Sequence, residues 1–120
     1  PMYSIKEIRN NMDLLNNIDW EMTPEDAVTL YLEWGNNWAR SNYVIRSKED
    51  VSYYFAVNTW EERPVIYLIR RNSEEAKELA KIYMPKQLEK RFLDDIGYNK
   101  GVYAIEGEVK EWLQSRLTFH

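Results

Sequence analysis

Two runs of β-branched and aromatic residues stand in the middle of the chain, at residues 51–60 and 65–70, and only four residues separate them. Runs of this composition favour β-strands, and a connection this short favours antiparallel pairing. Alternate side chains of a strand point to opposite faces of its sheet, and both alternate sets of these runs are largely apolar. The sequence therefore predicts a hairpin with helices covering most of one face and part of the other.

Helix signals surround this hairpin. Ser4 and Glu7 form a capping box at the start of a helix over residues 4–17, and Thr23 with Pro24 begins a second helix, which Gly35 ends. Apolar residues at helical spacing predict three more, over residues 73–83, over residues 85–96, and from residue 106 or 107 to residue 117. The side chains expected to be buried in the first two of these three are Leu79, Ile82, Tyr83, Leu88, Phe92, Leu93 and Ile96.

Two short extended runs complete the predicted sheet. Residues 43–46 precede the hairpin, with a polar turn between, and residues 101–105 are a candidate fourth strand at an edge. The predicted fold class is α+β: a three-stranded antiparallel meander with this candidate edge strand, packed with about five helices. With 120 residues, the chain is expected to form a single domain over residues 1–120.

The chain is poor in the residues that carry nucleophilic and metal chemistry. It has no cysteine, which excludes disulfides, thiolate nucleophiles and iron–sulfur clusters, and its one histidine is the final residue, His120. Phosphate-loop, dinucleotide-binding, zinc-protease and EF-hand patterns are all missing from the sequence. We therefore predict no catalytic residue, no metal site and no cofactor, and favour a protein that is not an enzyme.

Carboxylates are the remaining acid–base groups. Asp19 and Glu21 flank Trp20, and a carboxylate beside a large apolar ring can have a raised pKa and act as an acid. We favour the simpler interpretation, in which both are solvated residues of a turn. An N-terminal proline such as Pro1 can also serve as a general base, as in the tautomerase superfamily, but a strand follows the proline there and a helix is predicted here. We expect Met2 to be the native start.

Charge and hydropathy bear on the partners. The net charge of −4 argues against duplex nucleic acid and anionic membranes. No apolar run approaches the roughly 20 residues that cross a bilayer, and the first residues lack the apolar segment of a signal peptide. A cysteine-free domain suits a reducing compartment, so we expect a cytoplasmic protein. A protein partner, self-association or a small molecule all remain open.

The candidate binding residues are aromatic rings, amides and arginines. Five of them lie at the predicted helix end near Gly35: Trp34, Asn36, Asn37, Trp38 and Arg40. The hairpin adds Asn58, Trp60 and Arg70. Tryptophan faces beside amides and arginine suit a sugar ring, a base or a peptide, and the arginines of the hairpin suit an anionic ligand. They suit equally a helix end anchored in the core by its tryptophans, and solvated arginines at a strand edge. We favour this structural interpretation.

Three stretches resemble a small family of uncharacterised bacterial proteins, associated with anaerobic sulfate- and metal-reducing bacteria. They are residues 22–38 (MTPEDAVTLYLEWGNNW), 67–76 (YLIRRNSEEA) and 99–105 (NKGVYAI), and the resemblance covers nearly the whole chain. It implies a bacterial, cytoplasmic, stand-alone domain. The family has no known activity, ligand or catalytic residue, so the resemblance assigns no role to any residue here.

Three functions are consistent with these observations. The first is a non-enzymatic interaction or regulatory module, because the chain is rich in aromatic residues and poor in catalytic groups. The second is a protein that binds a small ligand, nucleotide or anion on the aromatic, Asn and Arg surface around Gly35 and Trp60. The third is a carboxylate-based enzyme, which requires a cleft holding an acid of perturbed pKa. We rank them in this order.

Overall fold

The computed structural model describes residues 2–21, 23, 51–72, 76–95 and 100–118. The chain opens with two short helices, α1 (Ile5–Arg9) and α2 (Met12–Asn16), and the two-residue strand β1 (Ile18–Asp19). Three seven-residue strands follow: β2 (Ser52–Asn58), β3 (Val65–Arg71) and β4 (Ala76–Ile82). The last described elements are α4 (Lys86–Lys90), the π-helical turn η2 (Arg91–Asp95), β5 (Val102–Ala104) and α5 (Gly107–Leu117).

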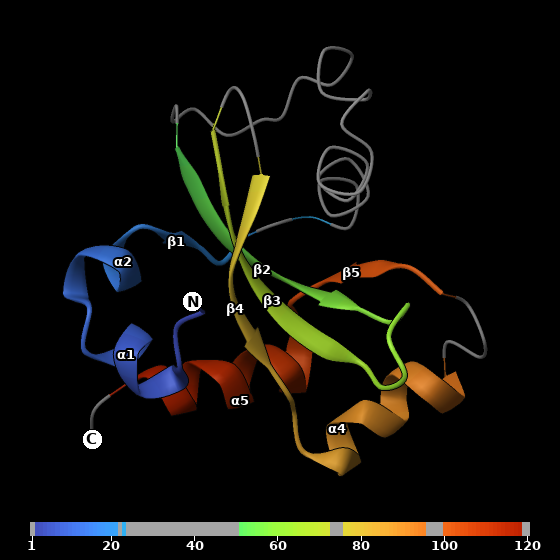
Figure 1. Cartoon of the computed structure of the whole chain (residues 1–120). Coiled ribbons are helices and arrows are strands. Elements are labelled where there is room, and N and C mark those ends of the chain that lie inside the picture. Colours follow the sequence, from blue (N-terminus) through green and yellow to red (C-terminus); the bar gives the residue numbers. More distant parts are fainter. Residues whose placement is uncertain (1, 22, 24–50, 73–75, 96–99, 119–120) are drawn as a thin grey trace.

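The described strands form one five-stranded sheet (Figure 1). β2, β3 and β4 make an antiparallel meander in chain order. Two short strands share the free edge of β2: β1 pairs with Tyr53 and Tyr54 in parallel, and β5 pairs with residues 56–58 in antiparallel orientation. The fold is α+β as predicted, and residues 102–104 form the expected additional strand. The prediction of a purely antiparallel sheet was wrong, because β1 makes the sheet mixed.

Residues 76–82 form a strand, and the prediction of a helix over residues 73–83 was wrong there. β3 is buried on both faces, so water cannot satisfy its backbone N–H and C=O groups. These groups therefore need hydrogen-bond partners along both edges of the strand. β2 supplies the partners along one edge and β4 those along the other. Of the side chains expected to be buried, Ile82 is buried and Leu79 half-buried, but Tyr83 is exposed.

The helix predicted over residues 4–17 is divided in two. Its capping box is confirmed, since Ser4 Oγ accepts from the backbone N–H of Glu7 and Glu7 Oε1 accepts from that of Ser4, both at 3.1 Å. A second cap interrupts the helix: Asn11 Oδ1 accepts from the backbone N–H of Leu14, which starts α2. Met12, at the first position of α2, is exposed.

The other predictions have mixed outcomes. α4 begins after Pro85 as expected. In η2, Phe92 is buried as expected, but Leu93 is exposed. α5 is confirmed, with Val109, Leu113 and Leu117 buried. The described residues hold four α-helices. The predicted helix from Thr23 to Gly35 and the predicted strand at residues 43–46 lie outside the described residues, apart from Thr23 itself.

Both faces of the sheet carry an apolar cluster, as the alternation predicts. The first cluster joins the sheet to the helices, and its members include Ile8, Leu14, Phe55, Val57, Ile66, Leu68, Ala80, Ile82, Phe92, Val109 and Leu113. The second lies on the opposite face and contains Tyr54, Ala56, Val65, Tyr67, Ile69, Val102 and Ala104. We call these two faces the helix face and the opposite face. α1 packs against both α2 and α5 beside the helix face (Figure 1).

Candidate functional site

Arg70 lies at the end of the helix face of β3, beyond the buried Leu68. The register places Tyr53 of β2 on one side of it and Lys77 of β4 on the other. The three side chains therefore form a row across the sheet: a phenol, a guanidinium and an ammonium. Directly opposed like charges destabilise a pair of strands, so the Arg70–Lys77 pairing costs stability unless an anion lies nearby.

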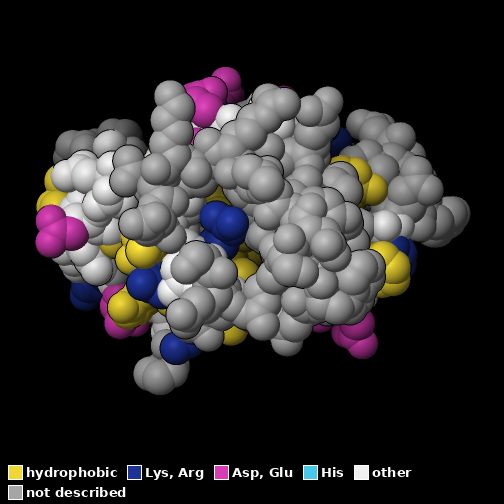
Figure 2. All heavy atoms as spheres, turned by 90° about the horizontal axis from the view of Figure 1, so that it is seen from above, with side chains coloured by type: hydrophobic (Ala, Val, Ile, Leu, Met, Phe, Trp, Pro, Cys, Tyr) yellow, Lys and Arg dark blue, Asp and Glu magenta, His cyan; other side chains and the backbone are white. Residues whose placement is uncertain are grey.

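A pocket of about 410 Å³ opens beside this row. Its walls come from the N-terminal segment, from α2 and the residues around it, and from all three long strands. They are Tyr3, Asn11, Asp13, Leu14, Asn17, Tyr53, Arg70 and Leu79. We call this the Arg70 pocket. Seen from above the view of Figure 1, the described part of the molecule shows Lys and Arg side chains beside hydrophobic ones (Figure 2).

Local hydrogen bonds hold the walls of the Arg70 pocket in place. The backbone N–H of Tyr3 donates to the carbonyl of Leu79 at 2.8 Å, which ties the N-terminal segment to β4. Asn11 uses its Oδ1 to cap α2, so its Nδ2 group remains available as a donor. Asn17 donates its Nδ2 to the Asp13 carbonyl at 2.7 Å, so its Oδ1 remains available as an acceptor. The two amides thus present opposite hydrogen-bonding groups.

The charged groups of the Arg70 pocket are not neutralised by one another. In the described part of the chain, no ion pair or hydrogen bond engages the guanidinium of Arg70, the ammonium of Lys77 or the carboxylate of Asp13. Arg70 is half-buried, where an ionic interaction is screened less than at the open surface. A guanidinium presents a planar fork of donors that matches a carboxylate or phosphate. The pocket can therefore hold an anionic group at Arg70.

The structure separates the predicted binding residues that it describes. Asn58 pairs with Val65 at one end of the β2–β3 hairpin, whereas Arg70 pairs with Tyr53 near the other end. Asn58 is buried, and its Oδ1 accepts from the backbone N–H of Trp60 at 2.7 Å, so it shapes the turn. Trp60 is 57% exposed beyond that turn.

Arg70 therefore lies apart from Asn58 and Trp60, at the other end of the hairpin. The five candidates near Gly35 lie outside the described residues: Trp34, Asn36, Asn37, Trp38 and Arg40. The sequence reasoning also missed most of the Arg70 pocket, namely Tyr3, Asn11, Asp13, Asn17 and Tyr53. One available signal was the row of asparagines at positions 10, 11, 16 and 17, since asparagine favours helix ends.

The acidic pair around Trp20 has a structural arrangement. Trp20 packs against Phe55, with ring centroids 5.2 Å apart. Asp19 Oδ1 accepts from the backbone N–H of Glu21 at 2.9 Å, and Glu21, 88% exposed, forms an ion pair with Lys110 at 3.3 Å. This arrangement matches the turn interpretation of Asp19 and Glu21 rather than a buried acid.

An acid of raised pKa lies on the opposite face of the sheet. Burial raises the pKa of Glu78, which the nearby Lys81 partly offsets. Burial and a hydrogen bond of 2.5 Å to Glu61 Oε1 raise the pKa of the Tyr67 phenol well above its ordinary value. Neither Glu78 nor Tyr67 lines the Arg70 pocket, so these groups do not form a cleft with it.

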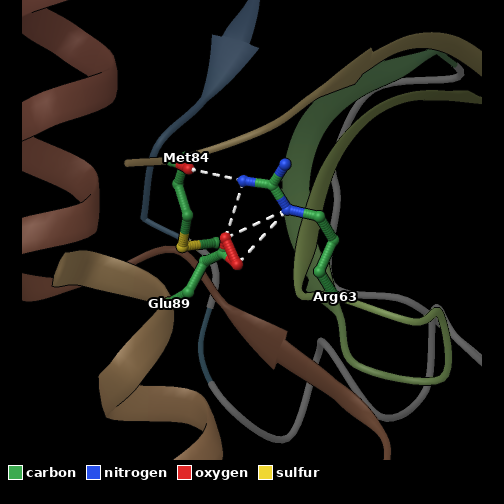
Figure 3. A network of polar contacts seen from close by, with 3 residues as sticks. All are labelled: Arg63, Met84 and Glu89. Atoms are coloured by element: carbon green, nitrogen blue, oxygen red, sulfur yellow. Dashed lines mark hydrogen bonds and ion pairs between the residues drawn. The ribbon is translucent and has the colours of Figure 1, made fainter. Parts of the chain in front are cut away.

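The most buried ion pair in the described residues joins the β2–β3 turn to α4 (Figure 3). Arg63 Nη2 and Nε lie 2.7 and 3.0 Å from Glu89 Oε2, and Nη2 also donates to the carbonyl of Met84 at 3.3 Å. The guanidinium lies over the ring of Tyr83, 4.6 Å from its centroid. Nε and Nη2 both donate to protein acceptors, and the guanidinium packs on a ring, so we interpret the Arg63–Glu89 clamp as structural.

A second pocket, of about 430 Å³, lies between α2 and the end of α5. Its lining residues are Met12, Leu15, Asn16, Trp20, Gln114, Leu117 and Thr118. None of them is charged, so this pocket suits an apolar group. It lacks the convergent ionic groups that would fix a ligand in one orientation. The Arg70 pocket is therefore the better candidate for specific recognition.

A cluster of metal ligands and a membrane-spanning helix are both absent from the described residues. No group of three or more His, Asp or Glu side chains that could hold a metal ion occurs among them. None of the described helices has the length and apolar character of a membrane span.

Comparisons with protein-family models, curated proteins and solved structures found no match to the chain. The family resemblance seen in the sequence therefore stays a prediction, and the site is interpreted from its own residues.

Proposed function

We propose that this protein is a non-enzymatic, regulatory binding module that takes a small organic anion in the Arg70 pocket. The observation that carries the proposal is the guanidinium of Arg70. It stands half-buried on the wall of a concave site, and no acidic side chain of the described residues forms an ion pair with it. Such a cation forms strong charge-assisted hydrogen bonds with an anion, and part of its own desolvation has already occurred in the folded protein.

The neighbours of Arg70 support an anion of moderate size. Lys77 is its cross-strand partner and adds a second positive charge next to the site. Tyr3 and Tyr53 offer ring faces and hydroxyls, and Leu14 and Leu79 add apolar surface. Small-molecule pockets of about 300–1,000 Å³ commonly combine an apolar lining with a few convergent polar groups. The volume of about 410 Å³ falls in this range.

Binding rather than catalysis is proposed because of the groups that line the pocket. Phenols, amides, a guanidinium and one carboxylate supply recognition, while the chain contains no cysteine and a single, terminal histidine. This proposal joins the first two functions inferred from the sequence: a regulatory module whose signal is a small anion. It centres the site on Arg70, one of the predicted binding residues, and leaves Asn58 and Trp60 outside it. We expect the module to act in the cytoplasm, which suits a cysteine-free chain.

Thermal shift and calorimetry on the purified protein test this proposal. Aliphatic and aromatic carboxylates and inorganic phosphate are titrated against wild type, Arg70→Gln and the control Arg116→Gln. Arg116 is exposed on α5 and does not line the pocket, so its replacement makes the same charge change elsewhere. An anion at 100 times its Kd should stabilise the wild type by about 2.7 kcal/mol.

The two arginine variants should differ clearly. Loss of a charge-assisted contact of about 1.5–3 kcal/mol weakens binding about 10- to 100-fold in Arg70→Gln, and Arg116→Gln should bind like wild type. The proposal is refuted if no anion in the panel binds, or if Arg70→Gln binds as tightly as the control variant.

A further inference from the structure

The Arg70 pocket is lined by one positively and one negatively charged side chain that do not form an ion pair with each other. Arg70 projects from β3 and Asp13 lies in the first turn of α2, and no ion pair joins these two side chains. Opposite charges that share a pocket of about 410 Å³ would gain energy by pairing. Because they stay apart, the space between them can hold a molecule that carries both a negative and a positive group.

The uncharged groups of the pocket extend this complementarity. The Nδ2 group of Asn11 is a donor for an anionic group, and the Oδ1 of Asn17, whose Nδ2 bonds the Asp13 carbonyl, is an acceptor for a cationic one. Leu14, Leu79 and the two tyrosine rings provide apolar wall. An α-amino acid presents all three features on one carbon atom: a carboxylate, an ammonium and a side chain.

We infer that the ligand of the Arg70 pocket is a free α-amino acid with an apolar side chain. This inference rests on the proposed anion site. The carboxylate binds Arg70, the ammonium binds Asp13, and the side chain packs on Leu14, Leu79 and a tyrosine ring. A simple carboxylic acid pairs with Arg70 but leaves Asp13 facing an uncharged group. A simple amine pairs with Asp13 but leaves Arg70 without an anion. The pocket therefore selects the zwitterion over either half.

Asp13 also has a structural interpretation, because an acid in the first turn stabilises a helix through its dipole. That role would lower the stability of α2 in an Asp13→Asn variant but would leave the ligand preference unchanged. The preference between a zwitterion and its desamino analogue therefore separates the two interpretations.

The probes are L-phenylalanine, 3-phenylpropanoate and phenethylamine, with L-leucine and 4-methylpentanoate as a second pair, measured by isothermal titration calorimetry. Wild type should bind each amino acid at least 10-fold more tightly than its desamino analogue, and phenethylamine more weakly than L-phenylalanine. Asp13→Asn should erase this preference and keep the binding of the carboxylates. Arg70→Gln should lose both members of each pair.

The control Glu111→Gln removes one negative charge from an exposed position on α5 and should keep the wild-type preference. Melting temperatures of all variants verify folding. If the carboxylates bind at Arg70 as tightly as the amino acids, or Asp13→Asn keeps the preference, the amino-acid inference is overturned and the anion site stands. If neither carboxylates nor phosphate nor amino acids bind, the proposed function fails as well.

Discussion

Replacing Arg63 by alanine would leave the carboxylate of Glu89 buried without its partner. The side chain of Glu89 is 9% exposed and that of Arg63 is 43% exposed, so water can reach the arginine but scarcely the glutamate. The variant also loses the bond from Nη2 to the Met84 carbonyl and the packing of the guanidinium on Tyr83. The change therefore detaches the β2–β3 turn from α4.

The magnitude follows from these exposures. Removing one partner of a fully buried pair costs about 3–5 kcal/mol, and an exposed pair contributes about 0–1 kcal/mol. The Arg63–Glu89 clamp lies between these limits, because one partner is buried and the other half-exposed. We expect Arg63→Ala to lower the free energy of unfolding by about 2 kcal/mol, which corresponds to a fall in Tm of about 8 °C. Arg63→Lys keeps the charge but not the planar fork, and should recover only part of the loss.

Urea denaturation of a double-mutant cycle measures the coupling directly. The cycle uses Arg63→Ala, Glu89→Ala and the double variant, with the ion pair of Lys110 and Glu21 as its surface control. The coupling free energy should exceed about 1 kcal/mol for the Arg63–Glu89 clamp and stay below about 0.5 kcal/mol for the control, where Glu21 is largely exposed. Additive effects at the clamp, or equal couplings at both pairs, would refute this reasoning.

Two further predictions concern the start of α5 and the opposite face of the sheet. Gly107 has φ +61°, and a Cβ there would lie 2.9 Å from Arg91 Nη1, so Gly107→Ala should cost at least about 1 kcal/mol in urea denaturation. The control Gly101→Ala, whose Cβ would meet its nearest atom at 3.9 Å, should cost clearly less; equal losses would contradict the account. Burial raises the pKa of Glu78 in the folded protein, so folding favours the protonated side chain. This contribution to the free energy of unfolding is fully present below the ordinary pKa of a glutamate, and it is lost as the pH rises through the raised pKa. Glu78→Gln should therefore raise Tm more at pH 7 than at pH 4, and a fall in Tm at pH 7 would show the opposite sign.

The hairpin could be predicted because local and tertiary preferences agree there. Residues 52–58 and 65–71 are rich in β-branched and aromatic side chains, their turn is short, and both faces of the strands are buried. The capping box at Ser4 and the apolar stripe of α5 are local signals of the same kind. In each case, the residues that determine the element are neighbours in the sequence.

β4 shows where this reasoning fails. The segment AKELAKI consists mainly of good helix formers, and its apolar residues also recur at helical spacing. The choice of strand is made by β3, whose buried backbone groups need a partner along its second edge. This requirement is not visible in the local sequence of β4.

The candidate site was only partly predictable for the same reason. Arg70 could be selected from its residue type and its place on a predicted strand. Its companions Tyr3, Asn11, Asp13 and Asn17 come from a segment more than fifty residues earlier in the sequence. They reach Arg70 because α1 and α2 pack beside the helix face and because Tyr3 bonds to β4. Nothing in the spacing of these residues indicates that packing.

One irregularity in β4 interrupts the alternation expected of a strand and determines which residue stands opposite Arg70. The register shifts between Leu68, which faces Ala80, and Ile69, which faces Glu78, so that Leu79 has no partner on β3. This β-bulge puts Leu79 and Ala80 on the same face, a spacing that a search for strict alternation does not detect.

The bulge also decides which charge stands opposite Arg70. Without the extra residue, the pairing of Leu68 with Ala80 would continue to a pairing of Arg70 with Glu78, and the two charges could neutralise each other. With it, Lys77 takes that position, and Glu78 lies across from Ile69 on the opposite face. The bulged Leu79 meanwhile lines the Arg70 pocket and accepts the hydrogen bond that positions Tyr3. A single extra residue in one strand thus contributes to the wall of the pocket and leaves Arg70 opposite a lysine instead of a glutamate, as the proposed anion site requires.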